Sequence, residues 1–348
     1  MELYEQHFSK CIEFYGTREH PSVANTIHCM GNVANSQGNY EIAINHYQEA
    51  LDIKTKVYGT REHPEVATIL HELGTVVSFQ GNHKEALNHY QHALDIYTRV
   101  YRTRQHSHIA STLFELGVVA NYQSHYEDAV KYYSESIDIY TIIHGTNERA
   151  DVATAVHNLG NTSLENDCTD DAAKYYQEAL EIRTKLFKTR EHIEVAKTIR
   201  GLGEVATKQG RYDEALSLLQ ESLTTFTKLN GSRQHSTIPF VLIALGNLYQ
   251  VQDQLDQALK IYFEAIDIEV SIEKTRDTIN VSKALHGIAR IERKLKQDDA
   301  ALELIREAID ILNGIFPNHP ELQEMASLAL DIERDIASHD RSSICVLM

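Results

Sequence analysis

Residues 59–101 carry the sequence GTREHPEVATILHELGTVVSFQGNHKEALNHYQHALDIYTRVY, and this stretch decides the fold. Its central glycine, Gly74, belongs to a series that recurs every 43 residues: Gly31, Gly74, Gly117, Gly160, Gly203 and Gly246, with Ala289 at the seventh place. Ala86 belongs to a second series with the same period: Ala43, Ala86, Ala129, Ala172, Ala215, Ala258 and Ala301. Two series in phase establish an internal repeat, which limits the fold to repeat architectures.

Each unit predicts two helices. In the quoted stretch, Leu70, Leu73 and Val77 have the spacing of one face of a helix, and Gln80-Gly81 ends it. A longer amphipathic helix follows, as over 40–58 in the first unit. The glycine and alanine of each unit are small, so we expect them where the two helices cross at close distance.

Between units lies a linker that begins as Thr17-Arg18-Glu19-His20. Strong copies start at Thr60, Thr103 and Thr189, and weaker copies start at Thr146, Ser232 and Thr275. Proline follows the histidine in several copies and suits the first turn of the next helix. Two hypotheses remain open for this linker. It is either a ladder of Arg and His that binds a ligand, or the end of one helix and the start of the next with solvated charges, and the pattern favours the second.

Carboxylates late in the second helix are expected to be solvated or paired with the linker arginines. They are Asp52, Asp95, Asp138, Glu181, Asp267 and Asp310.

The pairs Leu73-Gly74 and Ala86-x-x-x-Tyr90 separate this repeat from other helical repeats of similar length. They resemble the tetratricopeptide repeat (TPR) pattern, in the long form found in kinesin light chains and nephrocystin-3-like proteins. The resemblance covers nearly the whole chain. It implies an all-α TPR solenoid, a right-handed superhelix of antiparallel helix pairs.

The repeat divides the chain into four parts. Residues 1–20 correspond to a half unit with a second-type helix and its linker, and residues 21–314 to seven helix pairs of period 43. Residues 315–338 predict a C-terminal capping helix, which a solenoid end requires. Residues 339–348 are expected to form a flexible tail. The tail ends in Cys345-Val346-Leu347-Met348, which resembles a farnesylation signal on Cys345.

Composition excludes several classes of protein. Fifty acidic residues against 33 Lys and Arg give a net charge of −17, the opposite of what nucleic-acid binding favours. The four cysteines form no CxxC pair, and the sequence has no run of 18 apolar residues of the kind that spans a membrane. We therefore expect a cytoplasmic protein, peripheral to a membrane only through a lipid on Cys345.

In TPR proteins the first helices line the concave groove, so the resemblance places the candidate peptide-binding residues there. They are Asn32, Asn35, His71, Phe79, Phe114, Asn121, Tyr122, His157, Asn161, Lys197, Arg200, Lys208, Asn247, Gln250, Lys283, Arg290, Arg293 and Lys294. Seven of them are cationic, all in the last three units, and Glu204 is the one acidic residue at the groove positions of those units. A positive groove in an acidic protein favours an acidic peptide segment or a C-terminal carboxylate.

Catalytic and metal sites are not indicated. The sequence has no glycine-rich phosphate loop and no nucleophile elbow. Histidines at matching repeat positions, such as His71 and His157, lie too far apart on successive units to share a zinc ion. We therefore expect no metal, no cofactor and no enzymatic activity.

The function that follows is a non-enzymatic adaptor or scaffold that binds a protein or peptide partner in the concave groove. Two alternatives stay open. The chain is a regulatory TPR array of a larger signalling protein, or it is a prenylated effector that Cys345 recruits to a membrane.

Overall fold

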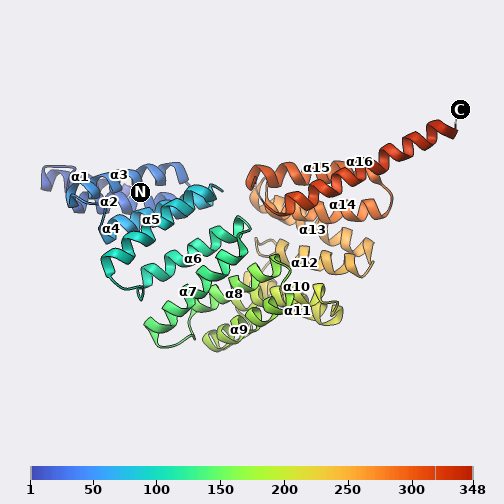
Figure 1. Cartoon of the computed structure of the whole chain (residues 1–348), viewed down its shortest axis with the longest axis horizontal. Helices are drawn as coiled ribbons and strands as arrows, with labels where there is room; N and C mark the ends of the chain where they lie inside the picture. Colours follow the sequence, from blue (N-terminus) through green and yellow to red (C-terminus); the bar gives the residue numbers. More distant parts are fainter. Residues whose placement is uncertain (1, 318, 347–348) are drawn as a thin grey trace. The chain divides into compact units, whose positions relative to one another are not determined.

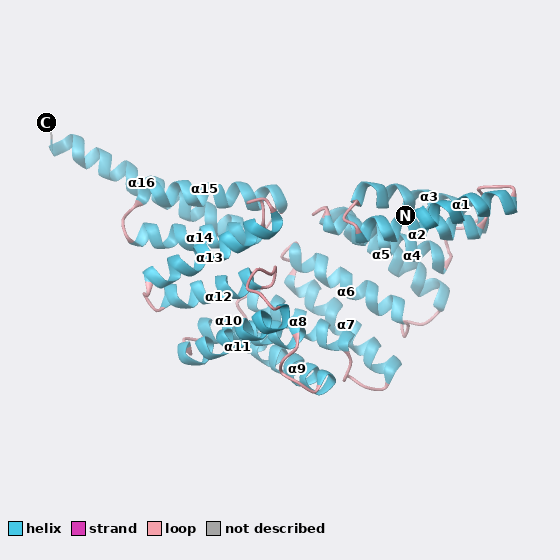
Figure 2. Cartoon of the chain, turned by 180° about the vertical axis from the view of Figure 1, so that it is seen from behind, coloured by secondary structure: helices cyan, strands magenta, loops and turns pink. Residues whose placement is uncertain are grey.

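The chain forms helices joined by short loops (Figures 1 and 2). The structure is a computed structural model that describes the backbone of residues 2–317 and 319–346, and the side chains of residues 3–317 and 319–337. In this part of the chain there are sixteen helices and no strand. The first helices of the seven pairs are α2 (Pro21–Ser36), α4 (Pro64–Phe79), α6 (Ser107–Tyr122), α8 (Ala150–Glu165), α10 (Ile193–Lys208), α12 (Ile238–Val251) and α14 (Ile279–Lys294). The second helices are α3 (Tyr40–Tyr58), α5 (His83–Tyr101), α7 (Tyr126–His144), α9 (Thr169–Phe187), α11 (Tyr212–Asn230), α13 (Leu255–Glu273) and α15 (Asp298–Ile315).

A half pair stands at each end. Helix α1 (Glu2–Tyr15) packs against α2, and α16 (Glu321–Val346) packs against α15. Met325 and Ile332 of α16 are fully buried, so this helix covers the last pair as expected of a cap. The helix continues to Val346, eight residues beyond the expected end at 338 and through most of the segment expected to be a flexible tail.

The pairs group into two compact units, residues 1–147 and 148–348. Each has one large apolar cluster built from buried residues of both helix types, and smaller clusters join α8, α9 and α10 in the second unit. The boundary falls at one of the weaker linker copies. There Arg149 stands at the cap position of α8 and its side chain makes no cap hydrogen bond, whereas His106 caps α6 in the preceding linker.

The recurring glycine makes room for an aromatic ring. A Cβ added at Gly74 would lie 2.8 Å from Cε1 of Tyr90, sixteen residues later on the second helix of the same pair. Tyr90 itself is fully buried. At the fifth pair Leu219 replaces the tyrosine and would meet the Cβ of Gly203 at the same distance. The expected close crossing is therefore confirmed, and a buried ring against a residue without a side chain is its physical reason.

Hydrogen bonds within the linker order its turn. Thr60 Oγ1 accepts a bond from the Glu62 amide at 3.0 Å, and His63 Nδ1 accepts one from the Glu65 amide at 3.3 Å, which caps α4. The His63 ring stacks on Tyr58, with centroids 3.7 Å apart. Pro64 occupies the first turn, where an amide would lack a partner.

The charged residues of the linker pair with the second helices. Arg190 binds Glu221, 31 residues later, at 2.8 Å, and Glu191 binds Lys228, 37 residues later, at 2.5 Å. These contacts explain the arginine and acidic residue of the motif as parts of the fold, and the histidine as a helix cap. The arginine partners are Glu49, Glu135, Glu221, Glu264 and Glu307, and all of them except Glu221 lie three residues before a carboxylate expected for that role.

Candidate peptide-binding face

The first helices form one side of each unit, which we call the inner face. In residues 148–348, α8 contacts α10, α10 contacts α12, and α12 contacts α14. In residues 1–147, α4 contacts α6 in the same way. The predicted groove residues lie on these first helices, so the structure places them along the inner faces of the two units.

Buried tyrosines fix the asparagines of the inner face. The Tyr176 hydroxyl donates to Asn161 Oδ1 at 2.7 Å, and the Tyr262 hydroxyl donates to Asn247 Oδ1 at 2.6 Å. Gln250 Oε1 lies 3.1 Å from the same Tyr262 hydroxyl. Because the amide oxygen is occupied, each asparagine turns its Nδ2 hydrogens away from the tyrosine. Tyr47 holds Asn32 in the same way in residues 1–147.

The predicted cations are mostly paired within the protein. Lys197 binds Glu194 at 2.7 Å, and Arg200 binds Glu204 on the next turn of α10. Arg290 differs, since it is exposed and forms no ion pair or hydrogen bond with any residue the structure describes. Of the seven predicted groove cations, Arg290 alone keeps an unpaired charge. The structure therefore does not support the strongly positive groove that the sequence predicts.

The remaining four cations pair with neighbouring elements of the same unit. Lys208 reaches Asp167 in the loop of the preceding pair, and Lys294 reaches Asp253 in the same way, each at 2.5 Å. Lys283 binds Glu321 at 3.2 Å, and Arg293 lies 3.2 Å from Asp335, both on the capping helix α16. These side chains hold successive pairs together.

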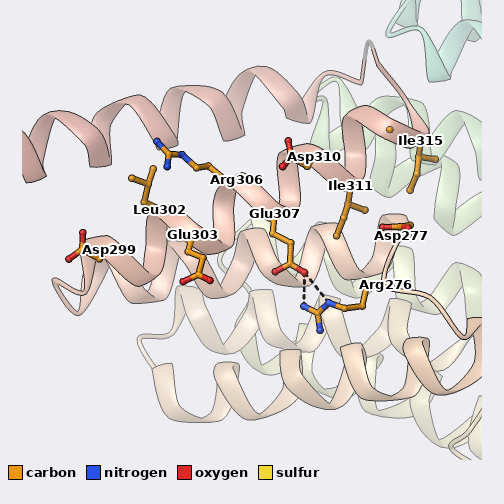
Figure 3. A pocket seen from close by; sticks show the side chains of 11 residues that line it. Arg276, Asp277, Asp299, Leu302, Glu303, Arg306, Glu307, Asp310, Ile311 and Ile315 are labelled. Carbon is orange, nitrogen blue, oxygen red and sulfur yellow. Dashed lines mark hydrogen bonds and ion pairs between the residues drawn. The ribbon is translucent and has the colours of Figure 1, made fainter.

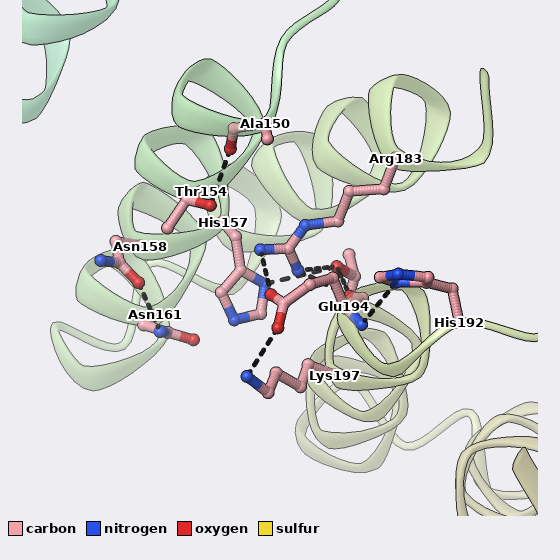
Figure 4. A network of polar contacts seen from close by, with 10 residues as sticks. Ala150, Thr154, His157, Asn158, Asn161, Arg183, His192, Glu194 and Lys197 are labelled. Carbon is pink, nitrogen blue, oxygen red and sulfur yellow. Dashed lines mark hydrogen bonds and ion pairs between the residues drawn. The ribbon is translucent and has the colours of Figure 1, made fainter. Parts of the chain in front are cut away.

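His157 belongs to a buried polar network (Figure 4). Arg183 of α9 is 2 % exposed and donates to Thr198 Oγ1 at 2.6 Å and to the Glu194 carbonyl oxygen at 2.7 Å. Its guanidinium also lies 3.0 Å from the Glu194 carboxylate. His157 Nδ1 lies 3.5 Å from Thr198 Oγ1. Burial, with Arg183 nearby, holds the pKa of His157 well below its usual value, so the ring is neutral.

Two of the three aromatic candidates lie between successive pairs. Phe79 stacks on Tyr40 with centroids 6.0 Å apart, and Tyr122 stacks on His83 at 4.9 Å. Both keep an exposed face, with Phe79 62 % exposed. Phe114 is half-buried beside Tyr133. Asn35 and Asn121 are also half-buried on this face.

Two carboxylates of this face were not among the predicted residues. His71 Nδ1 lies 3.1 Å from Thr112 Oγ1, and burial lowers the pKa of His71 to about 4. Its neighbour Glu72 and the equivalent Glu115 on α6 are both half-buried. Burial, followed by the charge of Glu72, raises the pKa of Glu115 to about 7. In the sequence, both glutamates stand directly before the Leu-Gly pair of their units, and this shared position could have identified them.

No three His, Cys, Asp or Glu side chains are grouped to hold a metal ion in the described residues. In the same part of the chain, no helix combines the length and apolar character that a membrane crossing needs. The lipidation motif at Cys345 lies outside the residues whose side chains are described.

Comparison with known families now decides the classification. Two profiles described as tetratricopeptide repeat match, one over residues 22–99 and 151–235 and the other over residues 281–321. The chain belongs to the tetratricopeptide repeat family. The TPR matches fall on the helix pairs described above, and they cover parts of both units.

Solved TPR-like structures share the fold. The apo form of the quorum sensor NprR from B. thuringiensis is 17 % identical, with a TM-score of 0.66 over 89 % of this chain and 82 % of that one. A Rap protein complexed with competence and sporulation factor is 17 % identical, with a TM-score of 0.60 over 87 % and 76 %. Repeats of a putative kinesin light chain from Podosopora anserina are 19 % identical, with a TM-score of 0.52 over 60 % and 98 %. None of the curated protein sequences matches this chain significantly.

Proposed function

We propose that this protein is a non-catalytic adaptor whose inner face in residues 148–348 binds an extended peptide segment of a partner protein. The observation that carries the proposal is the pair of hydrogen bonds from Tyr176 to Asn161 and from Tyr262 to Asn247. Both tyrosines are buried, so the asparagines are held by rigid neighbours.

The held amides offer N–H donors to a ligand. Exposed Asn247 has its oxygen occupied by Tyr262, and its Nδ2 hydrogens remain for an acceptor such as a peptide carbonyl. Asn161 uses one such hydrogen for Asn158 and keeps the other. Asn161 and Asn247 lie two repeats apart, about 20 Å if successive first helices are about 10 Å apart. About six residues of extended peptide span that distance.

Arg290 sets the expected charge of the ligand. It follows Asn247 by one repeat and is the one unpaired cation among the predicted groove residues of the described chain. One carboxylate of the ligand, from a side chain or a C-terminus, suits this position. The other six cations are paired, so we propose one acidic group at the Arg290 end of the peptide.

The solved structures support a peptide as the ligand class. One similar Rap protein is described in complex with competence and sporulation factor, and another in complex with the Phr* peptide. These descriptions concern those proteins. They support the proposal because a solenoid of comparable fold has room for a peptide.

Selection from a random peptide library on the immobilised full chain tests the proposal. Enriched peptides are synthesised with a fluorescent label, and their affinity is measured by anisotropy for the wild type and three variants. Tyr262→Phe, Asn247→Ala and Arg290→Glu should each weaken binding about tenfold. Tyr262→Phe is the sharpest, because it removes only the hydroxyl that orients Asn247.

Gln220→Ala is the matched control, since Gln220 is exposed on the second helix α11 and should leave the affinity unchanged. The proposal is wrong if no peptide is enriched over an empty support. It is also wrong if all three inner-face variants bind the selected peptides as the wild type does.

A further inference from the structure

The last helix pair carries a second concave surface, away from the inner face. It is a groove of about 1040 Å³ between α15 and the linker that precedes α14. Its apolar part consists of Leu302, Ile311 and Ile315 (Figure 3). We call it the acidic groove, because Asp277, Asp299, Glu303, Glu307 and Asp310 line it together with only two arginines.

The same place in the fifth pair has a different lining. Residues 86 positions earlier, among them Arg190, Glu191, Ser217, Glu221 and Thr224, line a groove of about 480 Å³. Ser217 and Thr224 correspond to Glu303 and Asp310, so the acidic groove has two carboxylates that the fifth pair lacks. The other pairs also carry an acid at the place of Asp310, but they have Asn or Lys at the place of Glu303, so the two carboxylates occur together only in the last pair.

A lysine or arginine of the second helix pairs with the linker acid in four of the earlier copies. Wherever a described linker carries Glu at the motif's third position, the second helix that follows supplies a Lys or Arg 37 residues later. The pairs are Glu19 with Lys56, Glu62 with Arg99, Glu148 with Lys185 and Glu191 with Lys228. The linkers with Gln at this place, Gln105 and Gln234, are followed instead by Ile142 and by Ser271.

The last pair keeps the acid and loses the cation. Asp277 stands at the place of Glu191, and Gly314 stands at the place of Lys228. A Cβ added at Gly314 would meet no atom within 4 Å, so the volume that the lysine fills elsewhere is open. In the described residues Asp277 contacts only Thr275 of its own turn, through hydrogen bonds.

The other charges leave the groove negative. Arg276 binds Glu307 at 2.8 Å, and Arg306 binds Glu333 of α16, directed away from that pair (Figure 3). Asp299, Glu303 and Asp310 form no ion pair with any described residue. The five carboxylates and two guanidinium groups of the lining have a formal charge of −3.

We propose that the acidic groove binds a basic amphipathic segment of a partner protein. A lysine or arginine of that segment takes the place that Lys228 occupies in the fifth pair and binds Asp277. Its apolar side chains contact Leu302, Ile311 and Ile315, and further cations face Glu303 and Asp310. This surface is separate from the inner face, so a negative result for this proposal does not contradict the peptide-binding proposal for the inner face, or the reverse.

The probe is a labelled synthetic peptide in which Lys-Leu-Ala-Lys repeats, and the readout is fluorescence anisotropy with the full chain. Gly314→Lys restores the internal cation and should weaken binding at least about tenfold. Gly314→Ala adds helix propensity without a charge and should leave the affinity within about twofold. Glu303→Ser/Asp310→Thr gives the groove the residues of the fifth pair and should weaken binding by a similar factor.

The net charge of −17 alone attracts a basic peptide, so a charge-matched control is needed. Asp256→Ser/Asp267→Thr removes two exposed carboxylates from α13 and should leave the affinity nearly unchanged. The proposal is overturned if this control loses as much affinity as Glu303→Ser/Asp310→Thr, or if Gly314→Lys binds as the wild type does. Circular dichroism of each variant verifies that the helices are intact.

Discussion

Lys208 at the end of one first helix reaches back 41 residues and places its Nζ 2.5 Å from Asp167 Oδ1, in the loop of the preceding pair. Asp167 has a left-handed backbone with φ of 56°, in the loop that joins α8 to α9. Lys294 and Asp253 repeat the relationship two pairs later, and φ of Asp253 is 62°. A cation that sequence alone assigns to ligand binding is here a contact between repeats.

Substituting these lysines should therefore leave peptide binding intact. Lys208→Ala should change the affinity of peptides selected on the inner face by less than about twofold, and Arg290→Ala should change it more. The free energy of unfolding should fall by about 0–1 kcal/mol, as for an exposed pair. Anisotropy and urea denaturation measure the two effects. A large loss of affinity for Lys208→Ala would contradict this expectation and show that Lys208 is part of the peptide-binding site.

The glycine under the tyrosine ring should not tolerate a methyl group. Gly74→Ala places a Cβ 2.8 Å from the Tyr90 ring, so overpacking should reduce the free energy of unfolding by about 1–3 kcal/mol. Gly314→Ala is the control, because its Cβ enters open space and should stabilise the helix by up to about 1 kcal/mol. Thermal denaturation should shift in opposite directions for the two variants.

The buried Arg183 should be costly to remove by itself. Arg183→Ala removes the buried hydrogen-bond donor of the Glu194 carboxylate and of Thr198, while Glu194 keeps Lys197, and should cost about 1–3 kcal/mol. The junction of the fifth and sixth pairs offers the compensated version, with Phe226 and Thr237 at the corresponding places. Arg183→Phe/Glu194→Thr should recover most of the loss. Equal destabilisation of the single and double variants in urea would contradict this account of the network.

Stability should fall on acidification through the buried histidines. The pKa of His28 and of His71 is lowered to about 4, mainly by burial, from about 6.5 in the unfolded chain. The unfolded state therefore binds more protons between these values. The free energy of unfolding should decrease as the pH falls from about 6.5 to 4, by at most about 1.4 kcal/mol per pH unit for each ring. His71→Asn should flatten this dependence in urea melts at several pH values.

Glu115 should have the opposite dependence. Its pKa is raised to about 7 by burial and by Glu72, so the folded state binds more protons than the unfolded state. Its contribution is favourable below the usual value near 4.5 and is lost as the pH rises through about 7. Glu115→Gln should therefore raise the melting temperature at pH 8 and have little effect at pH 4.5. An equal shift at both pH values would exclude titration as the cause.

The repeat made most of the fold predictable. The glycine and alanine series locate every helix pair, and the caps follow from histidine and proline in the linker. The two-unit division was not predictable, because other linkers also depart from the motif, and only the structure shows that the Arg149 side chain makes no cap hydrogen bond. The length of α16 was missed as well, since a polar sequence such as that after residue 338 does not by itself end a helix.

The helices that carry the candidate residues were predictable, whereas the pairing of their charges was not. The first helices do carry Asn161, Asn247 and Arg290 on one face. Counting charges at groove positions took no account of acids elsewhere in the sequence, such as Asp167, Asp253 and Glu321, which neutralise the lysines. These ion pairs join residues 38 to 41 positions apart in the sequence. They form only because of the way successive units pack, and the residue spacing within one unit gives no information about that packing.

The linker contacts bear on how a chain of this kind changes length. Arg190 finds its carboxylate, Glu221, in the next unit, and Arg233 finds Glu264 in the unit after that. If one 43-residue unit were deleted, Arg190 would meet Glu264 in place of Glu221 and would keep an acidic partner, whereas Glu191 would meet Ser271 in place of Lys228. Duplication of a unit keeps the arginine pair in the same way. Such a gene can gain or lose whole repeats by recombination, and selection then acts on the number of units as a trait of its own.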